Sequence, residues 1–147
     1  MIPIEELQER LVGLELPSGT VTFEAYEAWI VHRTIDAPPA PEELLHPAFV
    51  FYAGLRGAGY PIGHLFELVA CPPEDGPMIG EMDLRQHRSA RVDEELHVAS
   101  RIVSIDRKSG RSGTFDVMRV RIEVTGADRD PVGTLDNVFV YPRREHA

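Results

Sequence analysis

An acidic and a basic side chain lie close together in the stretch "IDAPPAPEELLHPAFVFYAGL", which spans residues 35–55 and contains four prolines. The acid is Asp36, and the base is His46, immediately before a run of apolar residues. A carboxylate and an imidazole that reach the same proton can act as general acid and base. Asp36 and His46 are therefore the candidate catalytic residues. The alternatives are an ordinary turn acid at Asp36 and a capping or packed histidine at His46.

The apolar run after His46 has the composition of a buried helix. The segment "PAFVFYAGLRGAG" begins with Pro47, which suits the first position of a helix, and stays apolar on nearly every side until Gly57. A helix without a polar face has to be covered all round. The sequence thus predicts a central helix over residues 47–57, wrapped by other elements.

Four residues of this predicted helix are candidate substrate-binding residues. The backbone amides near Ala48 and Phe49 lie at the helix N-terminus, where partial positive charge favours a carbonyl oxygen or an anion. Tyr52 and Arg56 are one helical turn apart and would line either a substrate channel or a subunit contact. The sequence does not separate these two roles.

Two further helices are predicted before the prolines. The segment "IPIEELQERLVG" places Leu7 and Leu11 at helical spacing, with Gly13 just beyond the expected end. In "TFEAYEAWIVHRTI", Thr22 is an available N-cap, and the helix must end before the proline cluster at 38, 39 and 41. The apolar stripe of this second helix consists of Phe23, Tyr26, Trp29 and Ile30.

From residue 77 onward the periodicity changes from helical to alternating. The segments "MIGEMDLRQHRSARV" and "ELHVASRIVSIDR" have the pattern of strands. In the next segment, apolar residues at 118, 120, 122 and 124 alternate with charged residues, which predicts one wet and one covered face. The turn "GADRDP" then leads into a last strand over 133–141, which is expected to pair as an antiparallel hairpin with its predecessor.

Length and charge limit the function classes. With 147 residues, 43% of them hydrophobic, the chain is expected to form one domain over 1–147, helical over about 3–70 and strand-rich over about 77–142. The formal net charge of -9 opposes binding to nucleic acid and to anionic membranes. No apolar stretch approaches the roughly 20 residues that span a bilayer, and no signal-peptide pattern is present, so a cytoplasmic location is expected.

Several kinds of chemistry find no support in the residues. The single cysteine, Cys71, excludes an internal disulfide and is expected to be structural. No histidines and acids share the spacing of a metal site, so no metal is expected. A Gly-x-Ser-x-Gly elbow is absent, and "GLRGAG" has no lysine after it and no strand before it, unlike a phosphate-binding loop.

The C-terminal two thirds carry a resemblance to a known family. The segments "GEMDLRQHRSARVDEEL" and "ASRIVSIDRKSGRSGTFDVMRVRIEVTGADRDPVGTLDNVFVYPR" are similar to the second half of MaoC-like hot-dog proteins. In particular they resemble the N-terminal-type domain of hydroxyacyl carrier-protein dehydratase subunits and of fatty-acid-synthase dehydratase regions. The resemblance covers roughly residues 44–143. It implies an α+β hot-dog fold, with a curved antiparallel sheet around the central helix, and a dimer.

The resemblance also implies a reaction, although the family's catalytic motif is incomplete here. Active relatives have Gly-Asp-x-Asn-Pro followed by a histidine, and the pair holds a water or a substrate hydroxyl beside a thioester. In this sequence Asp36 matches the aspartate, but Ile35 replaces the glycine and Pro38 the asparagine. The histidine comes only at position 46. A hydro-lyase with a degenerate motif, acting between 3-hydroxyacyl and 2-enoyl thioesters, is the implied activity.

Two alternatives remain open at this point. The chain could be a non-catalytic hot-dog subunit of a dehydratase complex, or an acyl-thioester hydrolase on the same scaffold. In every case the expected ligand is an acyl thioester carried on coenzyme A or acyl carrier protein, with no other cofactor. The expected partner is a second hot-dog chain, identical or different, because an open sheet edge favours pairing.

Overall fold

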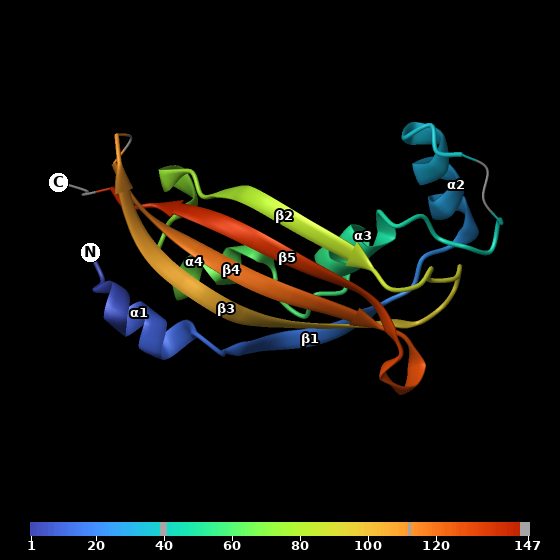
Figure 1. The fold of residues 1–147 in the computed structure, drawn as a ribbon, viewed down its shortest axis with the longest axis horizontal. Helices are drawn as coiled ribbons and strands as arrows, with labels where there is room; N and C mark the ends of the chain where they lie inside the picture. The colour runs from blue at the N-terminus through green and yellow to red at the C-terminus, as the bar shows by residue number, and fades with distance from the viewer. Residues whose placement is uncertain (39–40, 112, 145–147) are drawn as a thin grey trace.

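The computed structural model describes residues 1–38, 41–111 and 113–144. Its centre is a five-stranded antiparallel sheet in the order β1-β3-β4-β5-β2. The strands are β1 (Glu15–Val21), β2 (Met78–Gln86), β3 (Leu96–Gly110), β4 (Gly113–Thr125) and β5 (Pro131–Pro142). Figure 1 shows that the sheet curves strongly, and register shifts in β1, β2 and β3 mark the irregularities that accompany this curvature.

The alternation in β4 separates a covered face from an open one, as predicted. The apolar residues of the pattern are all nearly inaccessible to solvent, whereas the arginines between them are partly exposed. The turn after β4 is a short 3-10 segment (Ala127–Arg129), and β4 and β5 pair antiparallel across it. The predicted hairpin is confirmed. The covered face consists of Met118, Val120, Ile122 and Val124.

Four helices accompany the sheet: α1 (Ile4–Leu11), α2 (Ala25–Thr34), α3 (Phe49–Arg56) and α4 (Ile62–Leu68). In Figure 1, α3 and α4 lie along one face of the sheet, α1 lies at one end, and α2 stands off at the other end. A 3-10 turn (Pro73–Asp75) leads into β2. Among the described residues, no helix has both the length and the apolarity that crossing a membrane requires.

The central helix α3 packs on the sheet with one side only. Phe49, Val50, Ala53 and Gly54 are buried, and the Cα of Gly54 lies close to side chains of β4 and β5. Leu55, however, is 63% exposed, so the prediction that this helix is covered on every side was wrong. The helix also begins at Phe49 rather than at the proline at 47, because residues 46–48 form a preceding turn.

The strand β1 was not predicted, and it interrupts the helical part expected over 3–70. Its sequence, "ELPSGTV", contains a proline and a glycine and has no regular alternation. The strand forms because it is an edge strand that pairs with β3, about 80 residues later in the chain. Such long-range pairing leaves no signal in the local pattern.

The second helix, α2, differs from its prediction in its cap and in its buried face. Glu24 and Glu27 form a capping box in place of Thr22. Only Ala28 is buried, whereas Tyr26 and Trp29 are about 60% exposed. Apart from the buried Phe23, the predicted apolar stripe therefore faces solvent in the single chain. The helix ends at Thr34, before the proline cluster, of which position 39 lies outside the described residues.

Candidate functional site

The residues around His46 are held against the loop between β2 and β3. Leu44 forms an isolated bridge with Arg91, and the N–H of Leu45 donates to the carbonyl of Ala90 at 2.9 Å. This pairing fixes the half-buried His46 at the entrance of α3.

The imidazole of His46 is a hydrogen-bond acceptor at Nδ1. The backbone N–H of Ala48 donates to that nitrogen at 3.1 Å. A neutral imidazole that accepts at one nitrogen carries its proton on the other, so His46 holds its proton on Nε2. In this arrangement the neutral ring can only donate a further hydrogen bond.

The neighbour of His46 is a second histidine, His32 of α2, which the sequence did not single out. The two rings meet edge to face, with centroids 5.7 Å apart and planes at 80°. The Nε2 atom of His32 is buried and has no hydrogen-bond partner in the described part of the chain. No local signal in the sequence identified His32, because the contact joins α2 to the entrance of α3.

Asp36 does not join His46. It is exposed and has a φ of 50°, in the left-handed region, just after α2. This conformation, with the N–H of Ala37 donating to the carbonyl of His32 at 3.0 Å, ends the helix. No hydrogen bond or ion pair between Asp36 and His46 exists among the described residues. The geometry of Asp36 fits a turn residue, and its catalytic role stays a prediction.

Two spaces flank the histidine pair. His46, Phe49, Val50 and Gln86 help to line a narrow space without room for a water molecule. The other is an open cavity of about 680 Å³ between α2 and the loop that follows it. Its polar or aromatic walls are Tyr26, Trp29, His32, Arg33, Asp36 and Glu42.

The predicted substrate-binding residues of α3 have protein partners. The N–H of Ala48 is used by His46 Nδ1, and the N–H of Phe49 donates to the His46 carbonyl at 2.9 Å. The ring of Phe49 is 3% exposed, and the half-buried Tyr52 meets it edge to face at 5.5 Å. Neither amide can receive a carbonyl oxygen without leaving its present partner.

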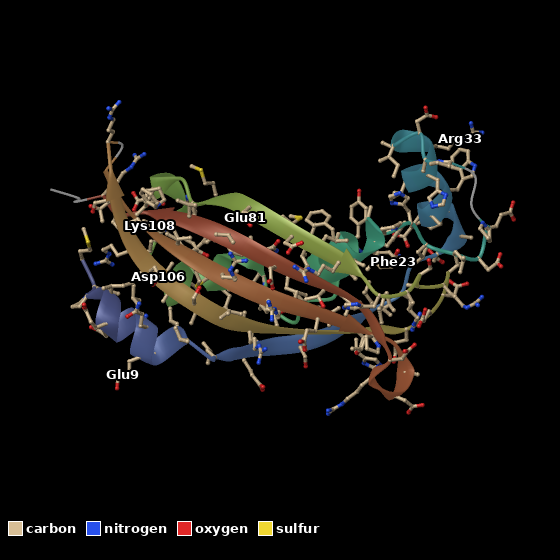
Figure 2. The ribbon with its side chains drawn as sticks, viewed as in Figure 1. Glu9, Phe23, Arg33, Glu81, Asp106 and Lys108 are labelled. Atoms are coloured by element: carbon tan, nitrogen blue, oxygen red, sulfur yellow. The ribbon has the colours of Figure 1, made fainter. Side chains whose placement is uncertain are left out.

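Arg56 joins α3 to α2. Its guanidinium forms an ion pair with Glu27 and lies 4.9 Å from the centre of the Phe23 ring. Figure 2 places Phe23 below α2 and Arg33 at the helix's far end. The pKa of Glu27 is lowered because its carboxylate accepts the Glu24 backbone N–H and, in addition, pairs with Arg56. This contact joins α3 to α2, the helix that carries His32.

The described residues give little support for metal binding or for cysteine chemistry. No cluster of three metal-binding side chains occurs within the described residues. Burial raises the pKa of the Cys71 thiol, which keeps it protonated and unreactive. The basic β3–β4 tip, marked by Lys108 in Figure 2, lies at the opposite end of the sheet from α2.

Residues 27–135 match the model of a protein family described as "FAS1-like, dehydratase domain region". The chain belongs to this family. The match covers most of the sheet, α3 and the histidine pair, and it confirms the MaoC-like resemblance seen in the sequence. A search of curated proteins found no match.

Solved structures confirm the hot-dog fold of this MaoC-like domain. The ChsH1-ChsH2 complex from Mycobacterium tuberculosis contains a chain 12% identical, with a TM-score of 0.68, covering 98% of this chain and 91% of that one. A MaoC-like dehydratase from Rhodospirillum rubrum is 15% identical, with a TM-score of 0.68 and coverages of 99% and 100%. A chain of the HadBC (3R-hydroxyacyl-ACP dehydratase) complex from M. tuberculosis is 14% identical, with a TM-score of 0.67 and coverages of 88% and 96%. At these identities the likeness shows the fold alone.

Proposed function

We propose that this chain binds acyl thioesters and interconverts 3-hydroxyacyl and 2-enoyl thioesters by removing and adding water. The observation that carries the proposal is His46 at the entrance of α3: its Nδ1 accepts from the Ala48 N–H, which leaves Nε2 as the nitrogen that can donate, and its ring contacts His32, a residue on the wall of a cavity of about 680 Å³. Dehydration beside a thioester needs a proton donor, a base and a stabiliser of enolate charge. His46 supplies the donor, and Asp36 on the cavity wall is one candidate for the base.

The family and the fold support this proposal without identifying the substrate. The matched family is a dehydratase region, and two of the structural neighbours are dehydratases. One of them is a 3R-hydroxyacyl-ACP dehydratase, and we propose that the substrate of this chain is likewise an acyl thioester, attached to coenzyme A or a carrier protein.

The His46→Ala variant tests the catalytic proposal. Hydration of crotonyl-coenzyme A and of longer enoyl thioesters is measured with the purified chain, alone and with any hot-dog chain that copurifies. Loss of the donor is expected to lower kcat by at least about 10²-fold. The matched control is His64→Ala, which removes a half-exposed histidine of α4. If the His46 variant and the control retain equal activity, His46 is not catalytic.

A second candidate function, a partner subunit of a dehydratase complex, is favoured by the open edge of the sheet. Strand β2 pairs only with β5 among the described strands, and its other edge is free. Met78, Ile79 and Met82 on this strand are 57%, 49% and 40% exposed. An exposed apolar edge strand favours pairing with another chain. We propose that a second hot-dog chain, identical or different, pairs with β2.

Introducing a charged residue at the free edge of β2 tests the proposed pairing with a second chain. The Ile79→Glu and Met82→Glu variants are expected to convert the oligomer into monomer, because each buries a carboxylate in the paired edge. Light scattering after size-exclusion chromatography measures the mass. Val12→Glu, at an equally exposed apolar residue after α1, is the control and should leave the mass unchanged. A wild-type chain that is monomeric and copurifies with no other chain would argue against the pairing.

A further inference from the structure

The exposed side of α2 is an apolar surface that the proposed function has not used. Residues three and four apart share one side of a helix, and the α2 face is the stripe formed by Tyr26, Trp29, Ile30 and Arg33. Its three hydrophobic members are between 48% and 61% exposed. Contiguous exposed apolar residues mark interaction surfaces, and tryptophan, tyrosine and arginine are enriched among the residues that dominate binding. The α2 face thus has the composition of a protein contact.

The helix α2 stands beyond the end of the open edge strand β2. His32 of α2 contacts the ring of His46, and His46 lines the narrow space together with Gln86, the last residue of β2. In Figure 1, α2 projects past this end of β2, on the side of the strand's free edge. A chain that pairs with β2 therefore comes to lie next to α2.

The charges of β2 favour a second copy of the same strand in antiparallel orientation. Glu81, Asp83 and Arg85 alternate along β2 and therefore lie on one face of the sheet. Two identical strands related by a two-fold axis run antiparallel, which brings the arginine of each copy toward the acids of the other. A parallel copy would place like charges opposite each other, which is destabilising.

Antiparallel pairing determines which part of the second copy reaches α2. Strand β2 runs from Met78 to Gln86, so the Gln86 end of one strand lies beside the Met78 end of the other. Met78 is exposed, and the 3-10 turn (Pro73–Asp75) before it carries the exposed Glu74. A methionine packs well on aromatic rings, and a carboxylate pairs with a guanidinium. The start of the partner's β2 is thus complementary to the aromatic and basic α2 face.

We propose that α2 reaches across the paired edge and packs the α2 face on the start of β2 of a second copy of this chain. Each dimer contains this contact twice, because a two-fold axis repeats it. This inference rests on the pairing of β2 proposed above and commits it to an identical partner. Tyr26, Trp29 and Arg33 also line the open cavity of about 680 Å³, so the partner covers a side that is open in the single chain.

The partner gives α2 the support that its own chain lacks. Of the ten residues of α2, only Ala28 is buried. A helix of this length depends on packing of its apolar side for most of its stability. The contact with the second copy therefore stabilises the helix that holds His32 against His46, and the candidate site is complete only in the dimer.

Crosslinking tests which part of the second copy meets α2. Cys71 is replaced with alanine, Ile30→Cys and Met78→Cys are added to the same chain, and the protein is treated with a short bismaleimide. The two positions lie at opposite ends of β2, which spans roughly 26 Å, so a crosslink between them joins two chains. A covalent dimer is expected from this protein, and none from Ile30→Cys or Met78→Cys alone.

Trp29 is the only tryptophan of the chain, so its emission reports on the α2 face. In the wild-type dimer the emission is expected at shorter wavelength and with weaker quenching by acrylamide than in the Ile79→Glu monomer. Trp29→Ala is expected to raise the dimer dissociation constant at least about 30-fold, as for a residue that dominates an interface. The control Val12→Ala, at an exposed apolar residue after α1, should keep this constant within about threefold.

The failures of this inference and of the β2 pairing are distinguishable. Met82→Cys, near the middle of β2, is expected to crosslink to its own copy when the two edges pair. If it does, while the Ile30–Met78 crosslink is absent and Trp29 is quenched equally in dimer and monomer, the contact of α2 is overturned and the pairing stands. A chain that is monomeric, or that pairs only with a different chain, overturns the second copy. None of these measurements needs turnover of an enoyl thioester, so a failure of the catalytic proposal leaves them unaffected.

Discussion

Replacing Asp116 with asparagine is expected to lower the free energy of unfolding by about 3–5 kcal/mol, because it leaves two largely buried arginine side chains without a counter-charge. Asp116 is fully buried on β4. Its carboxylate accepts from Arg107 Nε at 2.7 Å and from Arg143 Nε at 2.6 Å. Arg143 also donates to the Val69 carbonyl at 2.7 Å, which ties the end of β5 to the end of α4. The neutral amide keeps the shape but cannot balance two guanidinium groups.

Urea unfolding of the wild type and the variant measures this loss. The control is Asp106→Asn on β3, where the carboxylate is exposed and accepts only a 3.4 Å hydrogen bond from Gln8. A surface change of this kind is expected to stay within about 0.5 kcal/mol. If both variants unfold at the wild-type midpoint, the Asp116 carboxylate is not buried between the two arginines.

Arg107, one of the two arginines paired with Asp116, illustrates a contact that the sequence could not predict. The basic stretch at 106–111 has the composition of a solvated or phosphate-binding tip, yet Arg107 turns inward to Asp116, nine residues further along. Strands β3, β4 and β5 were predictable because alternation is a local pattern that burial on one face imposes. The choice of partner for one charged side chain depends on the register between strands, which no local pattern contains.

The candidate site was predicted in part for the same reason. His46 stands next to a recognisable helix start, so its position at the entrance of α3 followed from the sequence. The contact with His32 depends on the angle between α2 and α3, which the Arg56–Glu27 ion pair and the Phe23 ring set. The stripe of α2 was expected to be buried, but Trp29 is 61% exposed. Hydrophobic periodicity identifies a helix without saying what packs on it.

The second large expected effect on stability concerns Gly59, the last residue of the segment "GLRGAG". Replacing Gly59 with alanine is expected to lower the free energy of unfolding by about 3 kcal/mol, because main-chain atoms cannot move aside as flexible side chains do. A Cβ at Gly59 would lie 2.2 Å from the Ser18 carbonyl oxygen and 2.8 Å from that of Pro17. The Gly59 N–H donates to the Pro17 carbonyl at 3.2 Å, so the two backbones are in direct contact.

This glycine contact is what attaches the end of the central helix to the edge strand that the sequence did not predict. On the other side, a Cβ at Gly19 would lie 2.3 Å from the Gly57 carbonyl oxygen, at the register shift of β1. The matched control is Gly63→Ala in α4, where an added Cβ would meet no neighbouring side chain or other segment within 4 Å, so alanine should stabilise the helix by up to about 1 kcal/mol. Thermal and urea unfolding should therefore move in opposite directions for two identical substitutions four residues apart. Equal midpoints would mean that β1 does not pack against the end of α3.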